Sequence, residues 1–121
     1  MKVQLQRQSM RLRVDEEELA ALLAGDSLEN LTRFGGTGGW GTALSLHGGD
    51  QAVLLDGGTV CRLVLPRDAV QGLAARLPSR DGLEFSIALD DESSLQLQFD
   101  VDVRDSMRQR GHQRRGQRPP P

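Results

Sequence analysis

Aromatic residues are scarce in this chain of 121 residues, which has three phenylalanines, one tryptophan and no tyrosine. A hydrophobic core must therefore consist mainly of leucine and valine, and few rings are available to stack on nucleic-acid bases. The single cysteine, Cys61, excludes an internal disulfide and is typical of a small core residue. One cysteine and two histidines make the usual zinc ligand sets hard to assemble, so we expect neither a metal nor a cofactor.

Long apolar runs are also missing. No stretch of the chain approaches the ~20 consecutive apolar residues that a membrane-spanning helix needs. The residues that follow Met1 lack the apolar segment of a signal peptide. We therefore expect no membrane contact and a cytoplasmic location.

The charges divide the chain into two parts. Residues 1–103 contain 9 Lys and Arg against 16 Asp and Glu, a net charge of −7. Residues 104–121 contain six arginines and one aspartate, a net charge of +5, and few apolar residues. This asymmetry predicts a single folded domain over residues 1–103 and a disordered basic tail, rich in Arg, Gln and Pro, over residues 104–121.

Hydrophobic periodicity predicts two short helices among strands. Asp15 is a predicted N-cap, with Glu18 completing a capping box and Gly25 just past the helix end. A second helix follows Pro66, which suits its first turn. Strict alternation predicts strands over residues 83–89 and 95–103, and weaker patterns predict strands over 28–34, 42–47, 52–56 and 59–65. The first strand is predicted over residues 3–14, with a bulge or bend at 7–9 where the alternation changes phase.

Two parts of the chain resemble one another. The segments Arg11-Leu12-x-Val14 and Asp26-x-Leu28-Glu29, on either side of the first helix, parallel Arg62-Leu63-x-Leu65 and Asp81-x-Leu83-Glu84 around the second. The match predicts two β-α-β-β units related by a pseudo-two-fold axis, neither of which can cover its own apolar face. We therefore expect an α+β fold of about seven strands and two helices, mostly antiparallel and packed as a sandwich or a barrel-like sheet.

The N-terminal segments Lys2-Val3-x-Leu5, Ser9-Met10-Arg11-Leu12-Arg13-Val14 and Leu31-Thr32-Arg33-Phe34 resemble a family of short bacterial proteins without an assigned function. Members begin with a K-I-R-L…S-I-R-L-R-L strand, carry a later I-R-F strand and end another strand in L-P, as Leu65-Pro66 does here. The resemblance covers most of residues 2–103 and implies a shared fold, but no activity. Members also carry an E-K-D-F-x-C-L segment after the last strand. Its Phe and Cys are missing from residues 102–107 here, so an activity carried by that segment would be absent.

Motifs that could carry chemistry are few. The run Gly36-Thr37-Gly38-Gly39-Trp40-Gly41 satisfies the G-x-G-x-x-G pattern, but a strand rather than a helix is predicted after it. A dinucleotide site needs a helix there, so we interpret the run as a flexible connection between strands. His47 and Cys61 could form a base and a nucleophile only if the fold brought them together. Aspartates at the tip and on the polar face of the last hairpin suit solvated positions as well as they suit metal binding.

The candidate binding residues are Arg11, Arg13 and Trp40, and no residue is predicted to be catalytic. Arg11 and Arg13 lie on one face of the first strand, where they could hold an anionic ligand or pair with acids of a neighbouring strand. Sixteen acids in residues 1–103 favour pairing. Trp40 either caps the core or offers a contact surface to a partner.

Three functional hypotheses follow. The first is a non-catalytic binding or protein-interaction module, with an unidentified protein partner or a second copy in a homodimer. The second is a small anionic-ligand binder or enzyme that uses the arginine row of the first strand. The third is weak, salt-sensitive contact of the basic tail with nucleic acid. Because no catalytic constellation is visible, the sequence favours the first hypothesis.

Overall fold

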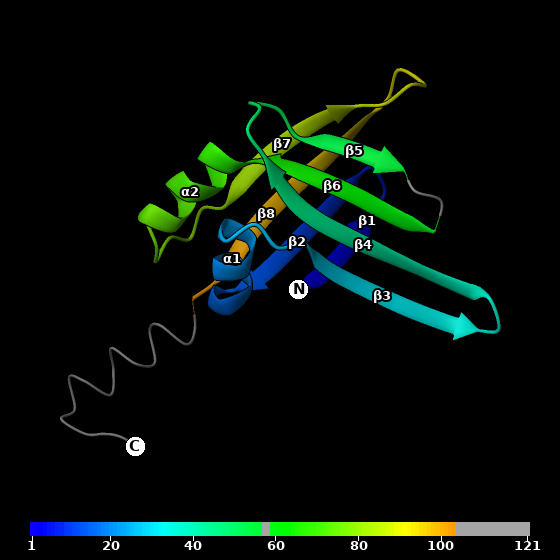
Figure 1. Cartoon of the computed structure of the whole chain (residues 1–121). Helices are drawn as coiled ribbons and strands as arrows, with labels where there is room; N and C mark the ends of the chain where they lie inside the picture. Colours follow the sequence, from blue (N-terminus) through cyan, green and yellow to red (C-terminus); the bar gives the residue numbers. More distant parts are fainter. Residues whose placement is uncertain (57–58, 104–121) are drawn as a thin grey trace.

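The computed structural model of the chain describes residues 1–56 and 59–103. These residues form eight strands and two helices (Figure 1). The elements are β1 (Lys2–Gln6), β2 (Ser9–Asp15), α1 (Glu16–Leu23), β3 (Leu28–Gly35), β4 (Gly38–His47), β5 (Val53–Asp56), β6 (Val60–Pro66), α2 (Arg67–Ala75), β7 (Leu83–Ala88) and β8 (Ser94–Asp102). The predicted α+β class is therefore confirmed. The predicted tail, residues 104–121, and residues 57–58, between two of the predicted strands, lie outside the described residues.

The strands form two four-stranded sheets. Sheet A has the order β1-β2-β8-β7 and sheet B the order β3-β4-β6-β5. Each sheet consists of two antiparallel hairpins joined by a central parallel pair, β2 with β8 and β4 with β6. The sheets cross one another as two layers, and the two helices lie together at one end (Figure 1). Within the described residues the sheets do not close into a barrel.

The predicted capping box of the first helix is present. The backbone N–H of Glu18 donates to Asp15 Oδ1 at 2.7 Å, and the N–H of Asp15 donates to Glu18 Oε1 at 3.0 Å. Gly25 follows the helix with φ of 105°, a conformation that glycine adopts without strain. Pro66 was predicted in the first turn of the second helix. It is instead the N-cap of that helix, and as the last residue of β6 it still pairs with His47 of β4.

The predicted first strand is in fact two strands. Arg7 has φ of 53°, and the chain reverses there, so that Val3 pairs with Leu12 and Leu5 with Met10. The phase change that was interpreted as a bulge is what a tight hairpin turn produces, because it brings both apolar sets to the same face. The chain therefore has eight strands instead of about seven. The first unit gains β1, and the strand predicted over residues 52–56 is its counterpart β5 in the second unit, so each unit has the order β-β-α-β-β.

The prediction that the glycine run is a flexible connection between strands is wrong. The run forms the tip and the first residues of a β-hairpin, because Gly38 to Gly41 lie within β4 and pair with β3. A bulge lies between Arg33 and Gly35. Gly35 and Gly36 have positive φ values of 91° and 54°, which explains glycine at the tip of the turn.

The internal repeat extends to the strand register. A shift of 51 residues turns the pair Val3–Leu12 into Leu54–Leu63, and a shift of 55 turns Leu28–Leu44 into Leu83–Phe99. The same two shifts turn the parallel pair Leu12–Phe99 of sheet A into Leu63–Leu44 of sheet B. Each half of the chain is a hairpin, a helix and a second hairpin, and it contributes one hairpin to each sheet. The pseudo-two-fold arrangement of two units is thus observed.

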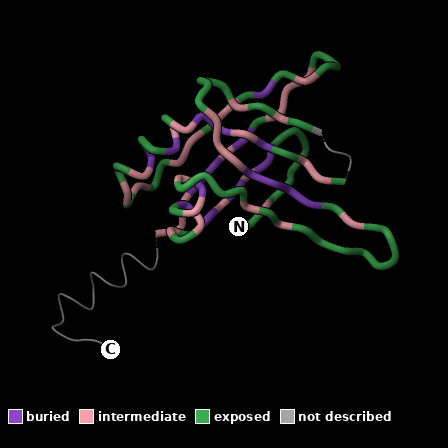
Figure 2. Tube along the Cα trace, viewed as in Figure 1, coloured by how far each residue is buried: buried purple, intermediate pink, exposed green. Residues whose placement is uncertain are grey.

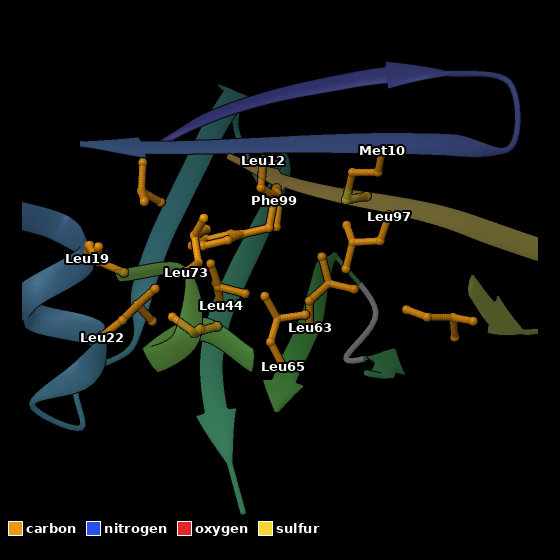
Figure 3. Packing of buried hydrophobic residues seen from close by; sticks show 13 residues of the cluster. Met10, Leu12, Leu19, Leu22, Leu44, Leu63, Leu65, Leu73, Leu97 and Phe99 are labelled. Atoms are coloured by element: carbon orange, nitrogen blue, oxygen red, sulfur yellow. The ribbon is translucent and has the colours of Figure 1, made fainter. Parts of the chain in front are cut away.

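The core lies between the two sheets (Figure 3). Leu12 and Phe99 from sheet A and Leu44 and Leu63 from sheet B are fully buried at its centre. Leu19 and Leu22 of α1 and Leu73 of α2 extend the core toward the helical end. Neither helix in the described part of the chain is long and apolar enough to cross a membrane.

Gly82 lies against β8 and has no room for a side chain. A methyl group there would overlap the carboxylate of Asp100 and the carbonyl oxygen of Phe99. Gly72, inside α2, offers a matched control, because no atom lies within 4 Å of the corresponding position.

We expect Gly82→Ala to lower the free energy of unfolding by ~1–3 kcal/mol, because a backbone carbonyl cannot move aside cheaply. Gly72→Ala should raise it by about 0.5–1 kcal/mol, because alanine has the higher helix propensity. Urea unfolding followed by circular dichroism measures both. Equal effects of the two substitutions would contradict this account of Gly82.

Candidate functional site

The outer face of sheet A carries the predicted arginine row and is polar throughout its centre. Arg11 and Arg13 of β2 alternate with the buried Met10, Leu12 and Val14, so both project away from the core. Their cross-strand neighbours on this face are Lys2 and Gln4 of β1 and Gln98 and Asp100 of β8.

Arg11 is committed to an ion pair. Its Nε donates to Asp100 Oδ2 at 2.6 Å, and the Asp100 side chain is only 11% exposed. Such a short charge-assisted bond compensates a carboxylate that has lost most of its water. The structure therefore shows for Arg11 the pairing that the acidic composition favoured.

Arg13 has no hydrogen bond or ion pair to a described residue. It borders a shallow hollow of about 350 Å³ at the end of β8, together with Arg11 and Arg80. Three carboxylates, those of Asp81, Asp100 and Asp102, line the same hollow. The guanidinium and carboxylate groups balance, so the hollow has no excess positive charge for an anionic ligand.

Trp40 does not cap the core. Thr32 and Trp40 are cross-strand partners on the core-facing side of sheet B, but the β3–β4 hairpin continues beyond the end of the core there. Trp40 is 36% exposed and Phe34, further along the same face, is 69% exposed. Figure 2 shows the far end of this hairpin as exposed along both strands. We call residues 31–40 the hairpin arm.

The outer face of sheet B is a surface that the sequence analysis missed. Leu31, Val53 and Leu55 are exposed there beside the half-buried Val60 and Val64. The sequence signal was the loss of alternation, because Val53-Leu54-Leu55 and Val60-Cys61-Arg62-Leu63-Val64-Leu65 place apolar residues on both faces of their strands. Such runs are typical of strands that are covered on both sides.

The structure does not bring His47 and Cys61 together. Cys61 pairs with Thr42 and His47 with Pro66, so about five residues, ~17 Å along the strand, separate them. His47 instead holds the turn that follows β4, since its Nε2 contacts the Gln51 carbonyl oxygen at 2.7 Å and its Nδ1 accepts the Gly49 N–H at 3.0 Å. No group of three metal-ligating side chains occurs among residues 1–56 and 59–103.

The aspartates at the last hairpin tip have a local structural role. The Ser93 hydroxyl and backbone N–H both donate to Asp91 Oδ1. These bonds lower the pKa of the Asp91 carboxyl and favour its charged form. A carboxylate that is ionised and engaged in its own turn is a poor candidate for proton transfer.

Neither a scan against protein-family models nor a search of curated proteins finds a match to this chain. The choice between the surfaces therefore depends on their geometry alone.

Removing Arg11 should leave the nearly buried Asp100 carboxylate without its ion-pair partner. We expect Arg11→Gln to lower the free energy of unfolding by about 1–3 kcal/mol, because a nearly buried charge loses its partner. Arg13→Gln, on the same strand and face, should change it by less than ~0.5 kcal/mol. Thermal and urea unfolding measure both variants. A loss for Arg13→Gln as large as for Arg11→Gln would contradict this account, because the loss would then not depend on the ion pair.

Proposed function

We propose that the chain is a non-catalytic protein-interaction module that contacts its partner through the hairpin arm. The observation that carries this proposal is the exposure of Phe34 and Trp40 on a hairpin that extends beyond the core. The described residues offer no comparable constellation for catalysis.

The distribution of aromatic residues supports the proposal. The chain has only four aromatic side chains. Phe99 is fully buried and Phe85 packs against the core, whereas Phe34 and Trp40 both lie on the arm. Leaving Phe34 mostly exposed and Trp40 partly exposed forgoes apolar burial that few other side chains of this chain could supply. Tryptophan and other large rings dominate the energetics of protein interfaces, so a partner would recover that burial.

The arm also has a suitable backbone. Glycines at positions 35, 36, 38 and 39 keep its tip narrow and free of bulky side chains. β3 is an edge strand of sheet B, so its outer backbone groups are available to a further strand. A partner could therefore combine ring burial with backbone hydrogen bonds along one edge.

The anionic-ligand hypothesis has less support. Arg11 is occupied by Asp100, and three carboxylates oppose the guanidinium groups around Arg13. Contact of nucleic acid with the basic tail stays a prediction, because residues 104–121 lie outside the described residues.

A pull-down from nuclease-treated native lysate, with mass spectrometry, tests the arm. The baits are the full chain, a chain ending at Val103, Phe34→Ser/Trp40→Ser, and Leu5→Ser. Leu5 is a matched control, because it is an exposed leucine on β1, in the other sheet. We expect one protein to be enriched on every bait except the arm variant, by about tenfold or more.

Circular dichroism first verifies that each bait is folded. Enrichment that survives in the arm variant would exclude the arm as the contact surface. Enrichment lost only on truncation at Val103 would place recognition in the tail instead.

A further inference from the structure

The repeat provides an internal control for the two outer sheet faces. Positions related by the two shifts occupy the same place in each sheet. Arg11 and Glu84 of sheet A recur as Arg62 and Glu29 of sheet B, but other outer positions differ in polarity. Lys2, Gln4 and Arg13 on sheet A correspond to Val53, Leu55 and Val64 on sheet B. By the 55-residue shift, Ser86 on β7 corresponds to Leu31 on β3. The fold accepts polar residues at all four places, so folding alone does not require the apolar set.

The apolar face of sheet B is open in the described structure. Figure 1 views the molecule from the side of sheet B, and neither helix crosses the sheet. Leu31 is 56% exposed and Leu55 is 51% exposed. The Leu31 side chain lies over Gly41 of β4, and a Cβ added to Gly41 would overlap it. The buried Ala43 is the next outer-face residue of β4. Small residues on the central strand leave a smooth face that another sheet could approach closely.

Two opposite charges lie in one cross-strand row of this face, Glu29 on the edge strand β3 and Arg62 on the central strand β6. Glu29 of β3 pairs with Ala43 of β4, Ala43 pairs with Arg62 of β6, and Arg62 pairs with Leu55 of β5. Glu29 and Arg62 are both exposed, and neither makes an ion pair with a described residue. Because Glu29 and Arg62 lie on opposite sides of the line between β4 and β6, the face is complementary to itself about that line.

We propose that the outer face of sheet B packs against the same face of a second copy of this chain. A two-fold axis parallel to the strands, between β4 and β6, would place β3 of each copy over β5 of the other. Glu29 of one copy would then lie above Leu55 and beside Arg62 of the other, and the reciprocal pair would form by symmetry. Aligned sheets pack in this way at a separation of about 10 Å.

The size of the face sets the expected strength. Four strands spaced by ~4.8 Å and seven residues rising ~3.3 Å each give a footprint of roughly 400 Å² per copy. Stable interfaces cover about 800 Å² per partner, so this one is small. We therefore expect a reversible dimer whose population rises with protein concentration.

Sedimentation equilibrium of the full chain, over a concentration series to about 1 mM, tests the dimer. The informative variant is Val53→Lys/Leu55→Gln. Sheet A has Lys2 and Gln4 at the corresponding positions, so we expect this variant to fold. It should weaken dimerisation by about tenfold or more, whereas Leu5→Gln should leave it unchanged. A monomer throughout the series, or a dimer that persists in the variant, would overturn the proposal.

Charge reversal tests the axis itself. Glu29→Arg and Arg62→Glu should each weaken the dimer by severalfold, because like charges then meet. The double variant should restore it, because both reciprocal pairs form again with their signs exchanged. A double variant as weak as the two effects combined would exclude this axis. None of these substitutions touches Phe34 or Trp40, so the dimer and the interaction through the arm can fail independently.

Discussion

Neither half of this chain forms a complete sheet by itself, and the rest of the structure depends on that constraint. Each half gives one hairpin to sheet A and the other to sheet B, and the halves meet through two parallel strand pairs, β2 with β8 and β4 with β6. The fully buried Leu12, Phe99, Leu44 and Leu63 belong to these pairs. The core and the register of both sheets therefore rest on contacts between halves. The helices close one end, where α1 and α2 touch.

Comparison of the two halves distinguishes residues that the fold requires from residues that it does not. Most core positions keep their apolar character in both halves, as Leu12 and Leu63 show, although the buried Leu97 corresponds to the buried Thr42. Several outer positions do not, since arginine at position 13 corresponds to valine at position 64. The overhang of the β3–β4 hairpin is a second asymmetry, because β3 has eight residues whereas its counterpart β7 has six. Apart from Glu29 and Arg62, whose counterparts Glu84 and Arg11 have the same charges, the features proposed to bind partners are those in which the halves differ.

Local rules predicted the parts of the fold that local chemistry decides. The capping box at Asp15 and Glu18 and the alternation in β7 and β8 identified their elements directly. The turn at Arg7 was misread, because a change of phase fits a bulge and a hairpin equally. The glycines at 38–41 were misread because glycine has low strand propensity, and pairing with β3 overrides it. The Arg11–Asp100 pair and the exposure of Trp40 depend on strand order and on where the core ends, and no local pattern encodes either.

The parallel pairing of β2 with β8 also has a consequence for synthesis. β2 is synthesised well before its central neighbour β8, which begins at Ser94. Met10, Leu12 and Val14 consequently have no sheet partner on that side until most of the chain has been translated. Contacts of such high sequence separation slow folding and prolong the exposure of apolar strands. The apolar face of β2 therefore stays incompletely covered until the residues from Ser94 onward have been made.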